Sequence, residues 1–251
     1  MSQSFVLRAD ERGYNKIVST GETAGYVGGH PDAYVTRWSS FNFHDYQDGR
    51  PGFGAIRVFG DETFNNPGCS YSMHRHHNFI ICAFVLEGEL THLNTLGNID
   101  TLKPGDFYAF SAGSGGFHEE LNMRAEPMKA LYLWLLPDRL LLPPAYTLGH
   151  FDAASGANRV TTLIGAPGEG GLAVPQDARV SRLVSDRPGT HRYTLRSRAH
   201  GVYAFVVEGG LQCDGTPLGR RDSKAVWGTD EVVCQTGAGR TDVLFVESVV
   251  H

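Results

Sequence analysis

The chain has no surplus of basic residues and no long apolar run. Its 22 lysines and arginines are outnumbered by 27 aspartates and glutamates, and no basic block could neutralise a run of phosphates. No apolar stretch approaches the ~18 residues of a membrane span, and charges interrupt the N-terminal segment where a signal peptide would be apolar. We therefore expect a soluble, cytoplasmic protein that binds neither nucleic acid directly nor a membrane.

Cysteine is scarce and scattered. The four cysteines, Cys69, Cys82, Cys213 and Cys234, form no CxxC pair. This spacing argues against a thiolate zinc site and against a redox dithiol. We expect separate, reduced thiols.

Long segments with apolar residues at helical spacing are also lacking. Instead, 31 glycines and 12 prolines separate short segments rich in Val, Phe, Leu and Tyr. This pattern predicts an all-β protein built as a barrel or sandwich.

An internal repeat refines that prediction. The sequence FVLEGEL at residues 84–90 recurs as FVVEGGL at residues 205–211, an offset of 121 residues. Each copy then passes through a turn into residues 102–106 or 218–222, so that a strand, a hairpin and a strand are duplicated. The repeat predicts two consecutive β-barrel domains.

Prolines place the crossover between the two barrels. The apolar segment 130–136 is followed by Pro137 and by Pro143-Pro144, which break regular strand pairing. We place the crossover near residues 137–160 and divide the chain into an N-terminal domain, 1–140, and a C-terminal domain, 141–251. The last strand is expected over residues 242–249.

Two short motifs carry metal-binding chemistry. Side chains alternate between the faces of a strand, so His74 and His76 point the same way, as do His118 and Glu120. Two neighbouring strands can thus direct three imidazoles and one carboxylate to a common point. This donor set suits Fe(II), Mn(II), Ni(II), Cu(II) or Zn(II), and the coordination positions left open favour a catalytic site over a structural one.

His77 and Glu119 have the opposite parity and are assigned to the surface or to a supporting role. The glycine-rich segment 111–116 lacks the Lys-Ser/Thr of a phosphate loop and is interpreted as a turn that delivers His118. The second copy of the repeat has neither motif, with only His200 near the place of a ligand, so the C-terminal domain should be metal-free. The remaining histidines are assigned to turns, surfaces or satisfied interior hydrogen bonds: His30, His44, His92, His150, His191, His200 and His251.

Together, these motifs resemble those of the pirin family. Pirins are bicupin proteins, and some of them are quercetin 2,3-dioxygenases. The similarity spans nearly the whole chain and rests on the segments 41–46, 52–54, 57–58, 74–76, 85–92, 96–98, 103–106, 111–120, 135–138 and 176–179. The resemblance implies two double-stranded β-helix barrels, of which the second is degenerate and lacks a metal.

Position by position, the resemblance places the family's ligands on the same four residues: His74, His76, His118 and Glu120. It implies non-haem iron as Fe(II), with Ni, Cu, Mn or Zn as alternatives. The sequence departs from the family at Arg75, where a proline is usual, and at Ile80-Ile81, where an acidic residue is usual. The second departure should change the pocket wall.

We therefore expect a metal-dependent dioxygenase that acts, with dioxygen, on a small flavonol-like or other enolic substrate, with Glu120 as ligand and catalytic base. One alternative is an iron-binding, redox-sensing regulatory protein that acts through protein partners. Another is a cupin isomerase or lyase acting on a small oxygenated substrate. A monomer is expected, because two packed barrels can cover each other's sheet edges.

Overall fold

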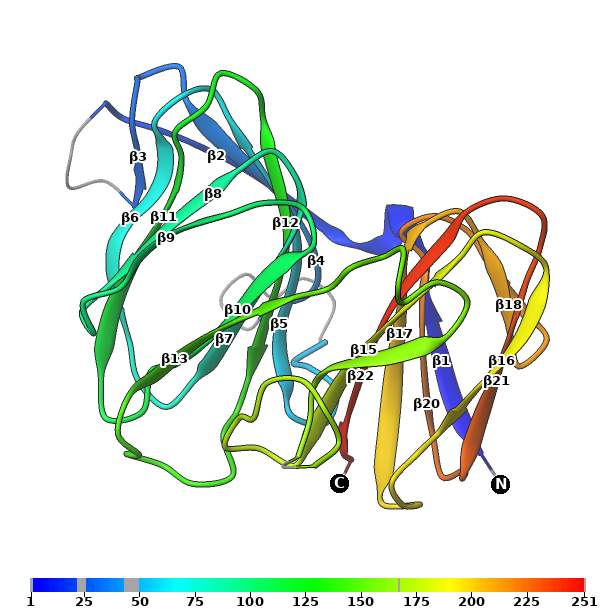
Figure 1. Ribbon diagram of the computed structural model, residues 1–251. Helices are drawn as coiled ribbons and strands as arrows, with labels where there is room; N and C mark the ends of the chain where they lie inside the picture. The colour runs from blue at the N-terminus through cyan, green and yellow to red at the C-terminus, as the bar shows by residue number, and fades with distance from the viewer. Residues whose placement is uncertain (1, 22–25, 43–49, 167, 251) are drawn as a thin grey trace. The chain divides into compact units, whose positions relative to one another are not determined.

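The computed structural model describes residues 2–21, 26–42, 50–166 and 168–250 (Figure 1). These residues form 22 strands, and their only helix is a three-residue 3-10 turn, Ala9–Glu11. The all-β prediction is confirmed. Within the described residues, no helix is long and apolar enough to cross a membrane.

Two compact lobes make up the chain. The larger lobe consists of Gly13–Gly52 and Ile56–His150, and the smaller lobe consists of Met1–Arg12, Phe53–Ala55 and Phe151–His251. Both lobes are therefore discontinuous in sequence.

Strand pairing explains the discontinuity. Strand β1 (Gln3–Leu7), at the start of the chain, pairs with β20 (Ser223–Trp227) in the smaller lobe. Strand β13 (Ala145–His150), within the expected crossover and past the predicted domain boundary, pairs with β10 (Asp106–Ser111) in the larger lobe. The division into domains 1–140 and 141–251 stays a prediction, and the compact lobes depart from it at these two strands and at Phe53–Ala55.

The larger lobe consists of two antiparallel sheets. Its other strands are β2 (Gly13–Val18), β3 (Val27–Gly28), β4 (Tyr34–Asn42), β5 (Ile56–Asn65), β6 (Cys69–His76), β7 (Ile80–Glu87), β8 (Leu90–Asn94), β9 (Ile99–Leu102), β11 (Gly116–Asn122) and β12 (Met128–Leu135). One sheet has the order β13-β10-β7-β12-β5-β4-β2 and the other β3-β6-β11-β8-β9. The core lies between them, where Phe64 and Tyr108 of the first sheet join Tyr71 and Leu90 of the second in one buried cluster.

The smaller lobe repeats this plan with fewer strands. Besides β1 and β20 it contains β14 (Val160–Ile164), β15 (Ala178–Ser185), β16 (Gly189–Thr194), β17 (His200–Glu208), β18 (Leu211–Cys213), β19 (Thr216–Leu218), β21 (Glu231–Thr236) and β22 (Thr241–Val249). The sheets have the orders β1-β20-β17-β22-β15-β14 and β16-β21-β18-β19. Val206 and Phe245 of the first sheet share a buried cluster with Leu211 and Cys234 of the second. The predicted last strand is confirmed as β22.

The sequence repeat is a structural repeat as well. Strands β7 and β8 are joined through Gly88 and strands β17 and β18 through Gly209, with φ angles of 74° and 75°. A Cβ atom on Gly88 would lie 2.7 Å from the carbonyl oxygen of Pro127, and one on Gly209 would lie 2.1 Å from that of Arg240. Only glycine combines this left-handed backbone with so close an approach.

The second turn of the repeat is also shared. Asp106 Oδ2 accepts a hydrogen bond from the backbone N–H of Lys103 at 2.8 Å. Asp222 Oδ2 accepts one from the N–H of Gly219 at 3.0 Å. The same aspartate-stabilised turn thus leads into β10 and into β20, which confirms the predicted duplication.

All four cysteines are free, as expected, and all four are buried. Cys213 and Cys234, however, are not separate, because they are direct Cα partners across the β18–β21 pairing. This contact could not be predicted from the sequence, because the two residues lie on different strands whose register is set by the fold.

Candidate metal centre

Strands β6 and β11 are neighbours in the five-stranded sheet, and their side chains alternate as predicted. On β6, Arg75 is exposed while His76 is buried, and on β11 Phe117 is exposed while His118 is buried. His118 is the direct cross-strand partner of His74. Because directly opposed residues share a face of the sheet, the imidazoles of the two strands meet inside the lobe.

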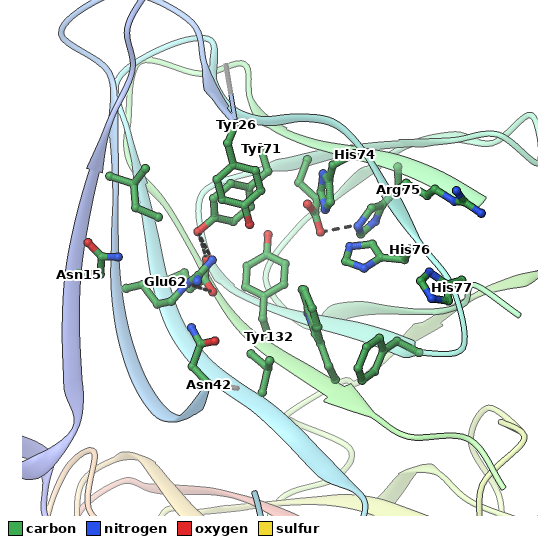
Figure 2. Close-up of a pocket in the computed structure, with 17 residues that line it drawn as sticks. Asn15, Tyr26, Asn42, Glu62, Tyr71, His74, Arg75, His76, His77 and Tyr132 are labelled. Atoms are coloured by element: carbon green, nitrogen blue, oxygen red, sulfur yellow. Dashed lines mark hydrogen bonds and ion pairs between the residues drawn. The ribbon is translucent and has the colours of Figure 1, made fainter. Parts of the chain in front are cut away.

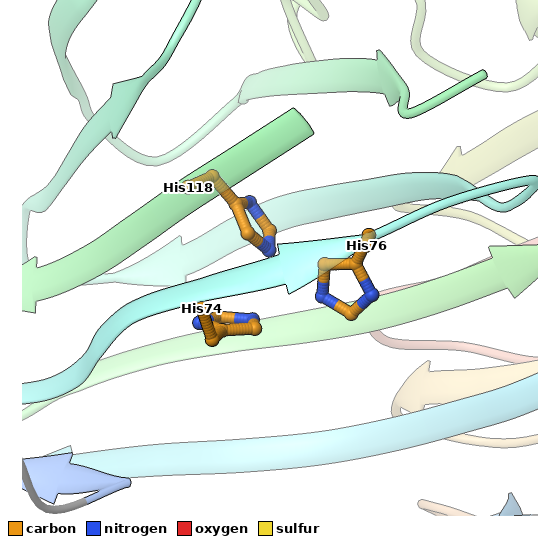
Figure 3. A group of neighbouring side chains, drawn as sticks. All are labelled: His74, His76 and His118. Carbon is orange, nitrogen blue, oxygen red and sulfur yellow. The ribbon is translucent and has the colours of Figure 1, made fainter. Parts of the chain in front are cut away.

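His74, His76 and His118 form one cluster (Figure 3). One nitrogen of each ring lies within 4.8 Å of those of the other two. The ring centroids are 4.4 Å apart for His74 and His118 and 4.7 Å apart for His74 and His76. Three nitrogens at this spacing can bind a single metal ion.

Hydrogen bonds fix which nitrogen two of these rings offer. His74 Nδ1 donates to the carbonyl oxygen of Ser72 at 2.8 Å, which leaves Nε2 as the electron-pair donor. His118 Nε2 is buried and has no hydrogen-bond partner among the described residues. Burial lowers the pKa of His74 and lowers that of His118 well below the usual value, so both rings are neutral, as metal binding requires. The three residues therefore fit a divalent transition metal.

His92 contacts the ring nitrogen of His118 that faces away from the histidine cluster. Its Nε2 lies 3.2 Å from His118 Nδ1, and its ring stacks on Tyr146 at 4.9 Å with an interplanar angle of 6°. A His118 ring that offered Nε2 to a metal would carry its proton on Nδ1 and would donate it to His92 Nε2. From the sequence, His92 was assigned with the other histidines to turns, surfaces or satisfied interior hydrogen bonds. A signal was present, because Leu90, His92 and Asn94 are the buried residues of an alternating strand beside β11.

Glu120 lies beside the three histidines but does not converge with them. A bulge between His118 and Glu120 shifts the register, so Glu120 faces Tyr71 across the pairing with β6. Its Oε1 accepts a hydrogen bond from Tyr108 Oη at 2.6 Å and lies 3.6 Å from His118 Nδ1. Burial raises the pKa of Glu120 to about 8, and the Tyr108 hydrogen bond opposes that rise. Its place as a fourth ligand stays a prediction.

The other predicted positions lie as follows. His77 follows the end of β6, where alternation no longer applies, and it is exposed at the edge of the cavity described below. Glu119 is half-buried, and burial raises its pKa. His200 is buried in the smaller lobe, with Nδ1 2.8 Å from Ser197 Oγ. His44, His251 and residues 43–46 of the first family motif lie outside the described residues.

A cavity of about 790 Å³ opens onto the three histidines (Figure 2). Its walls include the aromatic side chains of Tyr26, Phe79 and Trp134. The Trp134 ring packs edge-on against His76 at 4.6 Å. The size and the aromatic walls suit a small planar ligand.

A buried ion pair lies in the same cavity. Arg37 Nε donates to Glu62 Oε1 at 2.9 Å and Arg37 Nη2 donates to Tyr71 Oη at 2.8 Å, while Tyr71 Oη donates to Glu62 Oε2 at 2.5 Å. None of these three residues was among the site residues predicted from the sequence. The signal was one carboxylate on the otherwise apolar face of β5 that carries Val58 and Phe64.

The missing acidic residue of the family has a different consequence from the one expected. Ile80 and Ile81 are fully buried, and neither is among the described residues that line the cavity. Ile81 instead belongs to the core between the sheets. Besides Glu120, the carboxylate of this cavity is that of Glu62, on β5.

Tyr132, on β12, brings a hydroxyl group into the cavity (Figure 2). Its side chain is 3% exposed, and its Oη has no hydrogen-bond partner among the described residues. Burial first, and then the nearby carboxylates of Glu120 and Glu62, raise the pKa of Tyr132 well above the usual value. The hydroxyl group therefore keeps its proton and is a hydrogen-bond donor.

Comparison with known proteins identifies the family to which this fold belongs. Two family models match the chain: Pirin over residues 10–135, and the quercetinase C-terminal cupin domain over residues 163–247. An Escherichia coli K12 protein named quercetin 2,3-dioxygenase is 29% identical over 222 residues, which cover 86% of this chain and 94% of that protein. A pirin-like protein of Caulobacter vibrioides is 28% identical over 210 residues, covering 82% and 89%.

A solved structure has the same fold. The crystal structure of the Escherichia coli bacterial pirin YhhW in complex with nickel(II) matches with a TM-score of 0.84 at 23% identity, covering 99% of this chain and all of that one. With two consecutive cupin barrels and both family models matched, the chain belongs to the pirin family.

Proposed function

We propose that this protein is a metal-dependent dioxygenase acting on a flavonol-like or other aromatic substrate with an enolic or phenolic hydroxyl group. The observation that carries the proposal is the convergence of three imidazoles within 4.8 Å at a cavity with aromatic walls. The relative in Escherichia coli named quercetin 2,3-dioxygenase supports the substrate class.

Fe(II) is the metal proposed, held by His74, His76 and His118, with Glu120 as the fourth ligand. A divalent ion bound there would lower the pKa of a coordinated hydroxyl group and bring the substrate together with dioxygen. The donor set is also compatible with Ni, Cu, Mn or Zn. The nickel complex of YhhW, a relative of the same fold, makes nickel the first alternative.

The protein's own groups would bind the substrate and move one proton. Glu120 is the proposed acceptor of the proton of the substrate hydroxyl group, and Tyr108, hydrogen-bonded to its Oε1, holds the carboxylate in place. Trp134 and Phe79, whose rings lie 5.6 Å apart, would pack against the aromatic ring of the substrate and exclude water.

The proposal is tested by oxygen uptake. The protein is loaded anaerobically with each candidate metal, mixed with a panel of flavonols, and then exposed to dioxygen. We expect uptake with at least one metal and, with ¹⁸O₂, two labelled atoms in the product. His74→Ala should abolish both metal binding and uptake, whereas His191→Ala, a half-buried histidine of the smaller lobe, should change neither.

Other outcomes identify the alternatives. Absence of uptake with every metal and every flavonol would contradict the proposal and favour a regulatory binding protein. Turnover of substrate without oxygen consumption would contradict it in favour of an isomerase or lyase.

A further inference from the structure

Tyr132 stands on the central strand β12 between two very small neighbours. Its direct cross-strand partners are Gly60 on β5 and Ala83 on β7. Opposed residues share a face of the sheet, so neither partner covers the phenol ring. A Cβ atom on Gly60 would lie 2.6 Å from Glu62 Oε1, so this glycine also leaves room for the carboxylate. The phenol ring packs against Phe64 and Tyr71 of the core, at centroid distances of 6.2 and 6.5 Å, and the residue still lines the cavity.

The carboxylates near this hydroxyl group already have other donors. Both oxygens of Glu62 accept hydrogen bonds, one from Arg37 and one from Tyr71. Glu120 Oε1 accepts a hydrogen bond from Tyr108. Tyr132 Oη is buried and has no bond to any of the described protein groups. A buried donor without a protein partner is unfavourable, and such groups are found where a ligand completes the bonding.

The position of the hydroxyl group suits a role in binding. Figure 2 shows it in the cavity, with the pair of Glu62 and Tyr71 on one side and His74 and His76 on the other. A ligand that reaches the histidines with one oxygen would thus pass beside this donor.

We propose that Tyr132 Oη donates a hydrogen bond to a carbonyl or phenolic oxygen of the bound aromatic substrate and so orients it toward the histidines. This inference rests on the proposed function for its substrate class, and it deepens that function by naming the residue that selects for a second oxygen. The ligand class is a planar aromatic molecule with an acceptor oxygen in addition to the group that reaches the metal.

Binding is measured without turnover, on zinc-loaded full-length protein under anaerobic conditions, with quercetin as the probe and its absorbance as the signal. Tyr132→Phe should weaken quercetin binding about tenfold, as expected for the loss of one hydrogen bond. The matched control is Tyr203→Phe, which removes a buried hydroxyl group bonded to Ser223 Oγ at 2.8 Å in the smaller lobe. Quercetin binding should be unchanged in this control.

Thermal unfolding without ligand separates a binding role from a structural one. Tyr132→Phe should leave the Tm unchanged or raise it, because the hydroxyl group it removes has no protein partner. Tyr203→Phe should lower the Tm, because it breaks a buried hydrogen bond.

Three results would overturn the inference: unchanged quercetin affinity in Tyr132→Phe, a fall in its Tm comparable to that of Tyr203→Phe, or no quercetin binding by the unsubstituted protein. The proposed function is judged separately by oxygen uptake. If uptake is absent while quercetin still binds more weakly to Tyr132→Phe, the dioxygenase proposal fails and the role of Tyr132 stands.

Discussion

The Nε2 atom of His92 lies 3.2 Å from the Nδ1 atom of His118, with both rings buried inside the larger lobe. This pairing sets the tautomer of a predicted ligand from a strand that carries no ligand itself. Burial lowers the pKa of His92 to about 3, so the ring is neutral at neutral pH and can accept the Nδ1–H of His118.

Replacing His92 should therefore weaken metal binding. His92→Phe keeps an aromatic ring beside Tyr146 but removes the acceptor, and we expect a ~10–100-fold lower metal affinity. Competition with a chromophoric chelator measures the change. His191→Phe serves as the control, and equal affinities of the two variants would contradict the supporting role of His92.

Glu120 should contribute to metal affinity as a fourth ligand. Glu120→Gln preserves the size of the side chain and weakens the oxygen donor, so we expect at least about a tenfold loss of affinity. Turnover should fall further, since the amide cannot accept the substrate proton. Metal analysis and oxygen uptake are measured together, and a variant that retains both would remove Glu120 from the site.

The ion pair of Arg37 and Glu62 should matter for stability. The two side chains are 10% and 2% exposed, so Glu62→Ala leaves a buried guanidinium without its counter-ion. We expect a loss of about 3–5 kcal/mol in the free energy of unfolding, measured with urea.

The matched control for this pair is Glu231→Ala, which breaks an exposed pair with Arg192. That change should cost at most about 1 kcal/mol, because water screens exposed charges. Similar losses in the two variants would mean that the buried pair has no special role.

Asp222 should make the smaller lobe sensitive to acid. Burial tends to raise the pKa of Asp222, but hydrogen bonds from the backbone N–H groups of Gly219 and Ala9 and from Arg8 outweigh it and lower the pKa. A carboxyl group with a lowered folded pKa stabilises the protein above its unfolded pKa, and this contribution is lost as the pH falls below about 4.

Asp222→Asn should therefore be less stable than the unsubstituted protein at pH 7, and the difference should shrink as the pH falls through this range. Urea unfolding at a series of pH values measures it. Asp230→Asn makes the same charge change at a side chain that is 64% exposed, and it should show little difference at any pH. A loss of stability in Asp222→Asn that does not vary with pH would contradict the lowered pKa of Asp222.

The turn glycines of the repeat should tolerate no side chain. Gly88→Ala and Gly209→Ala place a Cβ atom in a left-handed conformation against a carbonyl oxygen, so each should cost at least about 1–2 kcal/mol of stability. Gly237→Ala, with no atom within 4 Å of the added Cβ, is the control and should be nearly neutral. Denaturant unfolding of the three variants measures the loss in the free energy of unfolding for each glycine.

The sequence determined those features that depend on a single strand and its neighbouring turns. Side chains alternate with a period of two, so the shared face of His74 and His76 followed from their spacing alone. The repeated turns at Gly88 and Gly209 were likewise local, because the backbone conformation there requires glycine. These local rules predicted the all-β class, the duplication and the shared face of each histidine motif, whereas the meeting of His118 with His74 depends on the pairing of β6 with β11.

The tertiary structure decided everything that depends on the register between strands distant in the chain. A bulge places Glu120 opposite Tyr71, and the pairing of β8 with β11 brings His92 into contact with His118. Alternation along a strand does not specify either of these partners. The unbonded hydroxyl group of Tyr132 depends on the small residues of two neighbouring strands. The sequence of a strand predicts which face of the sheet a side chain occupies. The residues that this side chain contacts depend on how the strands pair and how the sheets pack.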